Sequence, residues 1–542
     1  MNESTHLRFF QRPVLKQSQV VFQKQRPVLY HILFLFSWIF TIYTGAIGMD
    51  FSHWDENKLF RSLRDSIPEG TLLPGWYNYP SMIYDLTVLS VSPEIITSYL
   101  SDRSTFQGVM KERLWGKEAS EVFRPRARML FLGITSLTLL WIYLLVYIWT
   151  KQWPQALLSS AILASSWEFA YHARWIAPDS ILMQFGILTL LLVFLALRSS
   201  GRRKYMWLIA AAIAAGMACG TKYFGGLFLV PVFIGGHKLL RDNDAKWDRI
   251  FTLFLSLAAA FSLTFLIITP GALLDTAKMI EDIQYEINHY QGGDMGYTVR
   301  RGWEHLSLLF VYLFGVFFSS YIWLSALFSV FVTVGLYLLL KGNWKAVETW
   351  VFLSVPVLFI PYMSQQQVLM VRNYLLLFPF LAILCAKGLS AVWNSRLFQS
   401  SLVARTIFVA GLVSALLINY NWLYVAAQSI PASASTDRPQ ELRKYLLANW
   451  ETAYYLSPGA RSLIDSNEFP NVVHDPALAE KFIFVFREVN FPLANRPNVY
   501  DPVFGPYEVN FDYYPSWNED GRIVVMPMKA AISQSQFGFM YE

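Results

Sequence analysis

The chain has 542 residues, of which 54% are hydrophobic, 17% are aromatic and only 15% are charged. Soluble globular proteins carry about a quarter charged residues, so this composition indicates an integral membrane protein and excludes an ordinary soluble enzyme. The formal net charge of +6 does not indicate nucleic-acid binding, because the basic residues gather in short loops between apolar runs. That distribution is the positive-inside pattern of membrane proteins.

The first apolar run, from about Tyr30 to Met49, follows a basic amino terminus. No small-x-small cleavage site follows the run, so we interpret it as a retained transmembrane helix rather than a secretory signal. Residues 1–29 are then a cytoplasmic terminus. The two cysteines, Cys219 and Cys385, both lie inside apolar runs, and they predict neither a disulfide framework nor a thiolate metal site.

We predict a mainly α-helical polytopic membrane protein. Apolar stretches of roughly 17 to 25 residues are long enough to cross a bilayer. About eleven such spans are expected in residues 30–427, near residues 30–49, 130–150, 154–170, 181–197, 205–220, 224–240, 250–269, 320–340, 349–362, 374–393 and 402–426. The stretch Leu306 to Phe318 is either interfacial or part of the following span.

Two long segments are expected outside the membrane. Residues 50–127 contain half-apolar pieces that are too short and interrupted to span, so they predict interfacial helices. Residues 428–542 are polar, with strand-like pieces KFIFVF and RIVVM between turn signals, and predict a small α/β domain. If the amino terminus is cytoplasmic, every short basic loop is cytoplasmic, and both long segments are extracytoplasmic.

This topology brings charged residues from separate parts of the chain to the extracytoplasmic face. The acidic pair Asp55 and Glu56 follows the first span, and ionisable groups at a membrane boundary indicate a functional site. The other members of this set are Arg174, Asp179, Lys222 and Arg372. Arginine and lysine side chains bind phosphate, and a carboxylate near a hydroxyl acts as a general base. The set therefore suits a phosphate-linked donor and a reacting hydroxyl.

Adjacent residues of a helix point about 100° apart, so Asp55 and Glu56 are not expected to share one role. We favour Asp55 as the base and Glu56 as a helper that orients a cation or the acceptor, although the sequence alone leaves open which is the base. Asp179 and His289 also carry metal-ligand atoms, but no close-spaced motif appears, so a divalent cation stays open.

Each of these residues also has a purely structural interpretation. Arg174 could pair with Asp179 or Glu168 to close a turn, and Lys222 could extend its side chain to the interface. Arg372 could be an ordinary charge at a helix start, where a cation needs a partner. The expectation that all of them lie on one face favours the functional interpretation.

The motifs in chain order resemble the GT-C class of polytopic glycosyltransferases, in the branch of protein O-mannosyltransferases and lipid A aminoarabinose transferases. WDENKLFRSL is similar to the Asp-Glu motif of the first external loop, and HARWIAPDS to an Arg-x-x-x-x-Asp turn. Further likenesses are GTKYFGG, VRNYLLLFPF, the amphipathic DTAKMIEDIQYEINHYQGG, and PQELRKYLLANW at the start of the external carboxy-terminal domain. The segment YNYPSMIYDL departs from the family, because its usual lysine before proline is replaced around Tyr79; His289 also lacks a preceding glycine.

The resemblance implies a sugar donor on a polyprenyl phosphate, a protein, lipid or glycan acceptor outside the cytoplasm, and transfer with inversion. It implies Asp55 as base, Lys222 and Arg372, with Arg174, as donor-phosphate ligands, and Asp179 as a second carboxylate of the site. His289 and Tyr79 are weaker site candidates because of the two departures. The expected location is a prokaryotic inner membrane, since no added lumenal domain or retrieval signal appears.

Three alternatives remain at this point. A transporter or flippase of lipid-linked sugars would also place charges at membrane level, but near the bilayer midplane on broken helices rather than at span ends. An oligosaccharyltransferase or polymerase shares the topology, although the tail has no Trp-Trp-Asp-Tyr-Gly sequence. A structural or sensory membrane protein would leave the charged set without a purpose.

Overall fold

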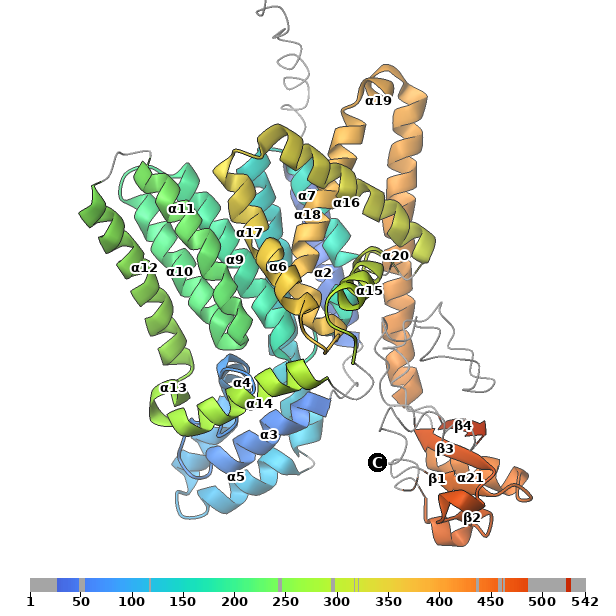
Figure 1. The fold of residues 1–542 in the computed structure, drawn as a ribbon. Helices are drawn as coiled ribbons and strands as arrows, with labels where there is room; N and C mark the ends of the chain where they lie inside the picture. Colours follow the sequence, from blue (N-terminus) through green and yellow to red (C-terminus); the bar gives the residue numbers. More distant parts are fainter. Residues whose placement is uncertain are drawn as a thin grey trace, which may run out of the picture.

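The computed structural model describes residues 27–47, 54–116, 118–241, 246–293, 298–315, 317–319, 321–434, 438–456, 461, 464–485 and 523–527. Within these ranges a few side chains, among them that of Asp55, lie outside the description. Ten helical segments of the described chain are long and apolar enough to cross a membrane. The protein is a multi-pass, mainly α-helical membrane protein, as the sequence predicts (Figure 1).

The candidate membrane spans contain the long helices of the bundle. They are α2 (Pro27–Ile47), α6 (Arg124–Thr150), α9 (Pro178–Arg198), α10 (Arg203–Thr221), α11 (Leu229–Arg241) with η2 (Tyr223–Phe228), α12 (Trp247–Ile268), α16 (Ile322–Asn343), α17 (Val347–Ser364), α18 (Phe378–Trp393) with η3 (Val371–Leu377), and α20 (Leu402–Ala434). Two further helices, α15 (Trp303–Gly315) and α19 (Arg396–Ser400), are shorter. The stretch near Leu306 is therefore a helix of its own, separate from α16.

One predicted span, residues 154–170, is broken in the structure. It forms α7 (Trp153–Ala164) and α8 (Trp167–His172). Ser166 has an extended backbone, with ψ 127°, and its hydroxyl donates to the carbonyl of Phe317 at 2.8 Å. At 1.5 Å per residue the 12 residues of α7 rise about 18 Å, less than the roughly 30 Å of a bilayer core. The break explains why ten spans are found where about eleven were expected.

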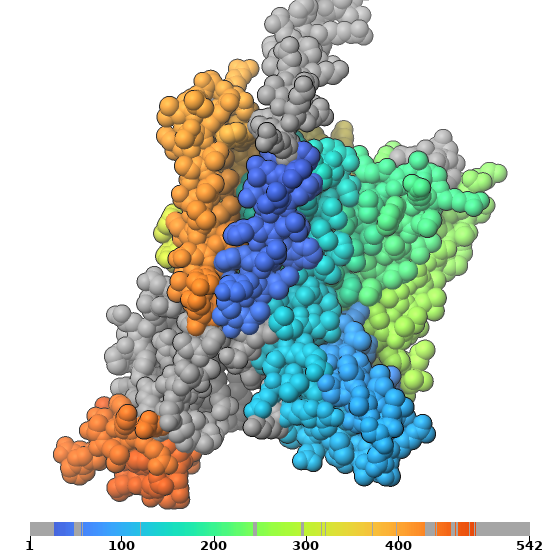
Figure 2. Space-filling model, turned by 180° about the vertical axis from the view of Figure 1, so that it is seen from behind, coloured from blue at the N-terminus to red at the C-terminus, as the bar shows by residue number. Residues whose placement is uncertain are grey.

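Small residues allow two of the spans to pack closely. A Cβ atom built at Gly335 of α16 would lie 2.0 Å from the carbonyl oxygen of Leu384, and one at Gly388 of α18 would lie 2.0 Å from that of Phe331. Membrane helices commonly associate through such contacts. Because lipid is as apolar as the side chains, the hydrophobic effect does not drive helices together, and close packing at small residues does. On another side of the bundle α2 lies beside α20 and α6 (Figure 2).

A layer of shorter helices covers one end of the bundle (Figure 1). It consists of α3 (Trp54–Ser66), α4 (Met82–Ser101), α5 (Phe106–Trp115), the π-helical turn η1 (Ala119–Phe123), α13 (Gly271–Leu274) and α14 (Thr276–Gly292). The half-apolar pieces of residues 50–127 thus form helices that do not span, as predicted. The basic loops after α6, α9, α16 and α18 lie at the opposite end, as does the basic last turn of α11.

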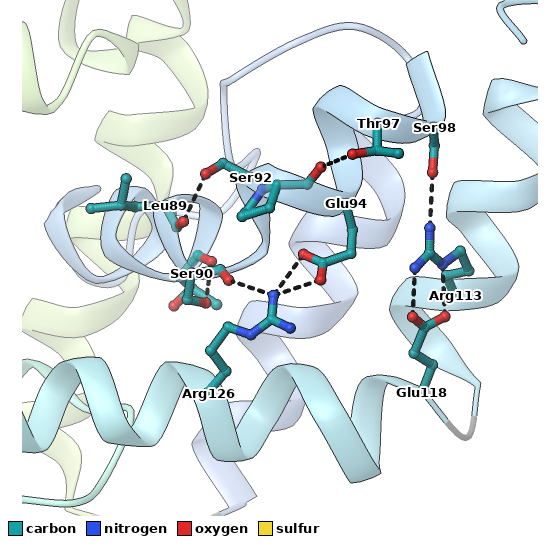
Figure 3. Close-up of polar contacts among 11 residues, drawn as sticks. Leu89, Ser90, Ser92, Glu94, Thr97, Ser98, Arg113, Glu118 and Arg126 are labelled. Carbon is teal, nitrogen blue, oxygen red and sulfur yellow. Dashed lines mark hydrogen bonds and ion pairs between the residues drawn. The ribbon is translucent and has the colours of Figure 1, made fainter. Parts of the chain in front are cut away.

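Ion pairs fasten the covering layer to the bundle (Figure 3). The Arg126 guanidinium of α6 donates to both carboxylate oxygens of Glu94 of α4, each at 2.7 Å. Arg113 of α5 donates to Glu118 and to the hydroxyl of Ser98. These contacts join three elements that lie up to 36 residues apart, and they hold α4 across the start of α6.

The part of the tail that the structure describes forms an α/β unit. It has α21 (Arg438–Ala448), the strands β1 (Tyr454–Leu456), β2 (Val472–Val473), β3 (Lys481–Val485) and β4 (Ile523–Pro527), and the short turns η4 (Ser466–Glu468) and η5 (Pro476–Leu478). The sheet order is β2-β1-β3-β4, with β4 antiparallel to β3. The predicted strands KFIFVF and RIVVM are thus paired neighbours. The boundary predicted near residue 428 falls inside α20, which continues to Ala434.

Asp85, in the first turn of α4 and outside the candidate spans, predicts a pH-dependent stability. Burial raises the pKa of its carboxyl to about 7. Because the folded state then binds more protons than the unfolded chain, stability falls as the pH rises from about 4 to about 7 and stays lower above that. Asp85→Asn should raise the unfolding free energy at pH 8 by about 1–2 kcal/mol, and the gain should shrink toward pH 5. Thermal unfolding across this pH range measures it, and a pH-independent difference would contradict the assignment.

Candidate functional site

Four residues from separate elements meet at a buried ammonium group. Lys222, between α10 and η2, donates from Nζ to Asp179 Oδ1 at 2.7 Å and to Asn373 Oδ1 at 2.6 Å. The hydroxyl of Tyr290 of α14 donates to the same Asn373 oxygen at 3.2 Å. Asp179 begins α9 and Asn373 lies in η3, so this site cluster joins two bundle helices to the covering layer.

The site cluster is buried and charged. Lys222 is 3% exposed and Asp179 is 2% exposed. Burial lowers the pKa of Lys222, but the charge of Asp179, the hydrogen bond to it and the nearby Tyr290 together raise it more, so the net shift of the pKa is upward. Asp179 Oδ2 has no hydrogen-bond partner among the described residues. The cluster is therefore a buried ion pair with one carboxylate oxygen that the described chain leaves unused.

The segment Trp76 to Pro80 forms one wall of the site cluster. The Tyr77 amide donates to Asp282 at 2.7 Å and the Asn78 amide group donates to Glu286 at 2.6 Å, and both carboxylates belong to α14. The segment is thereby held so that the ring of Tyr79 lies 5.4 Å from Lys222 Nζ. Tyr79, a weak candidate from sequence, thus lies beside Lys222, and a cation over an aromatic ring is favourable. Its role in a site stays a prediction.

The remaining predicted cations lie around this cluster. Arg372 directly precedes Asn373, is 7% exposed, and acts electrostatically on both Lys222 and Tyr290. Arg174 is 2% exposed, and its guanidinium lies over the ring of Tyr171 at 5.0 Å. Both arginines act electrostatically on the buried His172. The structure therefore gathers Arg174, Asp179, Lys222 and Arg372 in one region, as the sequence predicts.

Glu56 makes a buried ion pair between the covering layer and the bundle. It is 1% exposed, and Arg128 of α6 donates to it from Nε at 3.0 Å and from Nη2 at 2.5 Å. The amide of Ile176 also approaches Glu56 Oε1, at 3.5 Å. Ile176 lies in the turn between Arg174 and Asp179, so this pair and the site cluster flank the same turn. The expected role of Glu56 as a helper that orients a cation or the acceptor stays a prediction.

Two predicted site residues, Asp55 and His289, lie on helices of the covering layer. Asp55 is the second residue of α3, and its side chain lies outside the described residues, so its role as base stays a prediction. His289 of α14 lies against Tyr285 and Tyr290. Among the described side chains no group of three or more His, Cys, Asp and Glu could hold a metal ion. Because Asp55 is outside that set, a divalent cation at the acidic pair stays untested.

The sequence interpretation missed Arg128, Asn373 and Tyr290. Arg128 follows two other arginines at the start of an apolar run, where a cation is ordinarily a flanking charge. Asn373 and Tyr290 each stand beside a residue that was singled out, Arg372 and His289. Their adjacency was the available signal, but neighbours in sequence point in different directions, and only the fold shows which one faces Lys222.

This arrangement suits an anionic ligand that is neutralised by fixed charges. Lys222, Arg372 and Arg174 supply cationic donors from separate parts of the chain, and fixed donors of this kind can stabilise a negatively charged phosphate. The unused Asp179 oxygen can accept from a ligand hydroxyl. Glu56 of α3 approaches the same turn at the amide of Ile176.

Residues 89–281 match the model of the dolichyl-phosphate-mannose-protein mannosyltransferase family. The matched segment contains Arg128, Arg174, Asp179 and Lys222 and covers about a third of the chain. This match confirms the resemblance predicted from the motifs. No curated protein matches the chain in sequence.

Solved structures to which the chain is similar include two proteins. The ArnT of Cupriavidus metallidurans, in a crystal structure bound to undecaprenyl phosphate, is 13% identical, with 92% of this chain and 97% of that chain covered and a TM-score of 0.48. The oligosaccharyltransferase of Archaeoglobus fulgidus in its apo form is 11% identical, with 89% of this chain and 68% of that chain covered and a TM-score of 0.47.

Proposed function

We propose that the protein is a membrane glycosyltransferase that moves a sugar from a polyprenyl-phosphate donor to an acceptor hydroxyl outside the cytoplasm. The observation that carries the proposal is the buried Lys222, held between Asp179 and Asn373 with Arg372 next to it. A fixed cation at the end of the bundle suits a phosphate whose lipid chain lies between the helices. The family match supports the same donor class, because its members are described as using dolichyl-phosphate mannose.

In the proposed reaction the acceptor oxygen attacks the anomeric carbon of the donor sugar. The bond from that carbon to the phosphate oxygen breaks, and the electron pair leaves with the polyprenyl phosphate. Lys222 and Arg372, with Arg174, stabilise the negative charge that develops on the leaving phosphate. Asp55 takes the acceptor proton as general base. Glu56, fixed by Arg128, sets the position of the first turn of α3, and Asp179 accepts from a sugar or acceptor hydroxyl.

The covering layer gives the site its substrate-facing wall. Tyr79 and Tyr290 belong to the Trp76–Pro80 segment and to α14, and both contact members of the site cluster. Pocket shape rather than charge decides which sugar fits, so these residues are proposed to contact the sugar. The acceptor is a protein, a lipid or a glycan. We propose that the covering layer and the carboxy-terminal residues 428–542 select it.

A donor panel tests the proposal directly. The purified full chain in detergent is incubated with labelled polyprenyl-phosphate sugars and with soluble acceptors, and released polyprenyl phosphate is measured. Wild type is expected to release it from at least one donor, while Asp55→Asn should be slower by about a hundredfold or more, the usual cost of losing a general base.

Asp65→Asn serves as the control for Asp55→Asn. Asp65 lies on the same helix with an exposed side chain that pairs with Arg64, so its replacement should leave transfer unchanged. Movement of lipid-linked sugar across liposomes without release of polyprenyl phosphate, and with Asp55 dispensable, would reject the enzyme in favour of a transporter.

A further inference from the structure

A polar cavity lies at the end of the bundle opposite to the site cluster. Its volume is about 640 Å³. Residues near the ends of α6, α7, α9, α16 and α17 and from the middle of α18 line it, and these five ends lie together away from the covering layer (Figure 1). The cavity is therefore separate from the proposed transfer site and belongs to the other face of the membrane.

Two polar side chains that line the cavity make no hydrogen bond or ion pair with any other described side chain or backbone group. Gln155 of α7 is 6% exposed, and its side-chain amide makes no hydrogen bond to any described residue. Lys387 of α18 is half-buried, and no hydrogen bond or ion pair to a described residue reaches its ammonium group. Both side chains line the cavity, so their polar groups face its space rather than packed protein. Both groups are thus free to bind a ligand in the cavity.

The charge balance of the lining favours an anion. Arg198, at the end of α9, pairs with Glu348 of α17 at 3.5 Å, so these two charges offset one another. Lys387 is the remaining charged group of the lining, and its charge is not offset. Lys387 lies six residues before the end of α18 at Trp393, which places its Cα about 9 Å along the helix from that end.

We propose that this cavity binds a phosphate group, with Lys387 and Gln155 as its donors. A phosphate accepts hydrogen bonds from both an ammonium and an amide N–H, and it supplies the charge that Lys387 lacks. The cavity also has apolar lining from Leu339, Ile383 and Leu384, against which the first carbons of a lipid can pack. The phosphate belongs either to the headgroup of an anionic lipid or to a soluble phosphate ion, and both sources share this recognition chemistry.

Binding is tested on the purified full chain in neutral detergent. One arm adds phosphatidylglycerol, and the other adds inorganic phosphate. Retained lipid is counted by native mass spectrometry, and the melting temperature is followed in both arms. Wild type is expected to bind in one arm, and Lys387→Met and Gln155→Leu should each weaken that binding about tenfold, as expected for loss of a charge-assisted or buried hydrogen bond.

Lys345→Met is the matched control, because Lys345 is an exposed lysine between α16 and α17 at the same end and does not line the cavity. Binding of phosphatidylglycerol that is lost in both cavity variants and kept in the control identifies a lipid site. The same pattern with inorganic phosphate alone identifies a site for a soluble phosphate. Absence of binding in both arms, or unchanged binding in folded Lys387→Met and Gln155→Leu, overturns the proposal. None of these readouts depends on sugar transfer.

Discussion

Replacing Lys222 with methionine is expected to abolish sugar transfer and to lower the unfolding free energy by about 3–5 kcal/mol, the usual cost of breaking a buried ion pair. The reason is that Asp179 would keep a carboxylate that is 2% exposed and has lost its cation. Asn373 would also lose its lysine donor. Transfer rates and thermal unfolding of the purified variant measure the two effects separately.

A second variant separates the phosphate-binding role of Lys222 from its structural role. In Lys222→Met with Asp179→Asn the unpaired charge is gone, so stability should return to within about 1–2 kcal/mol of wild type. The proposed role predicts that this stable variant still binds polyprenyl phosphate at least about tenfold more weakly. Normal binding would show that Lys222 serves the fold alone. Lys204→Met, at the opposite end of α10, is the control and should change neither quantity.

Replacing Arg128 with methionine should have an effect of similar size. Glu56 would remain buried and charged without its bidentate partner, which costs about 3–5 kcal/mol. Because Glu56 and Asp55 are adjacent in α3, we also expect transfer to fall by about a hundredfold as the first turn loses its position. The measurements are thermal unfolding and the rate of polyprenyl-phosphate release.

Arg126→Met is the control for Arg128→Met. Arg126 lies two residues away on the same helix, and its side chain is 41% exposed where it pairs with Glu94 (Figure 3). Exposed pairs contribute about 0–1 kcal/mol, so this variant should stay close to wild type. Adding Glu56→Gln to Arg128→Met should restore most of the stability. Equal losses in the two arginine variants would show that the burial of Glu56 is not what matters.

Much of the architecture follows from the sequence, because it depends on local composition. The length of an apolar run decides whether a helix can cross a bilayer, and ten helical segments with this property lie in the predicted places. The strands β3 and β4 coincide with KFIFVF and RIVVM for the same reason. Charged residues at span ends are also visible in sequence, so Arg174, Asp179, Lys222 and Arg372 could be singled out together.

The break between α7 and α8 was not predictable in this way. By hydropathy, residues 154–170 are one apolar run. In the structure the backbone turns at Ser166, whose hydroxyl donates a hydrogen bond to the carbonyl oxygen of Phe317. That acceptor is 151 residues away in sequence. A contact of this kind depends on how the helices pack, and no local pattern reports it.

The sequence by itself determined the class of the protein, its approximate spans and the set of candidate charges. Only the tertiary structure decided which charges are partners: Glu56 with Arg128, and Lys222 with Asp179 and Asn373. The physical reason is that hydropathy and helix periodicity are properties of neighbouring residues, whereas an ion pair requires two side chains to meet within about 4 Å. Those meetings are set by the packing of helices that are far apart along the chain.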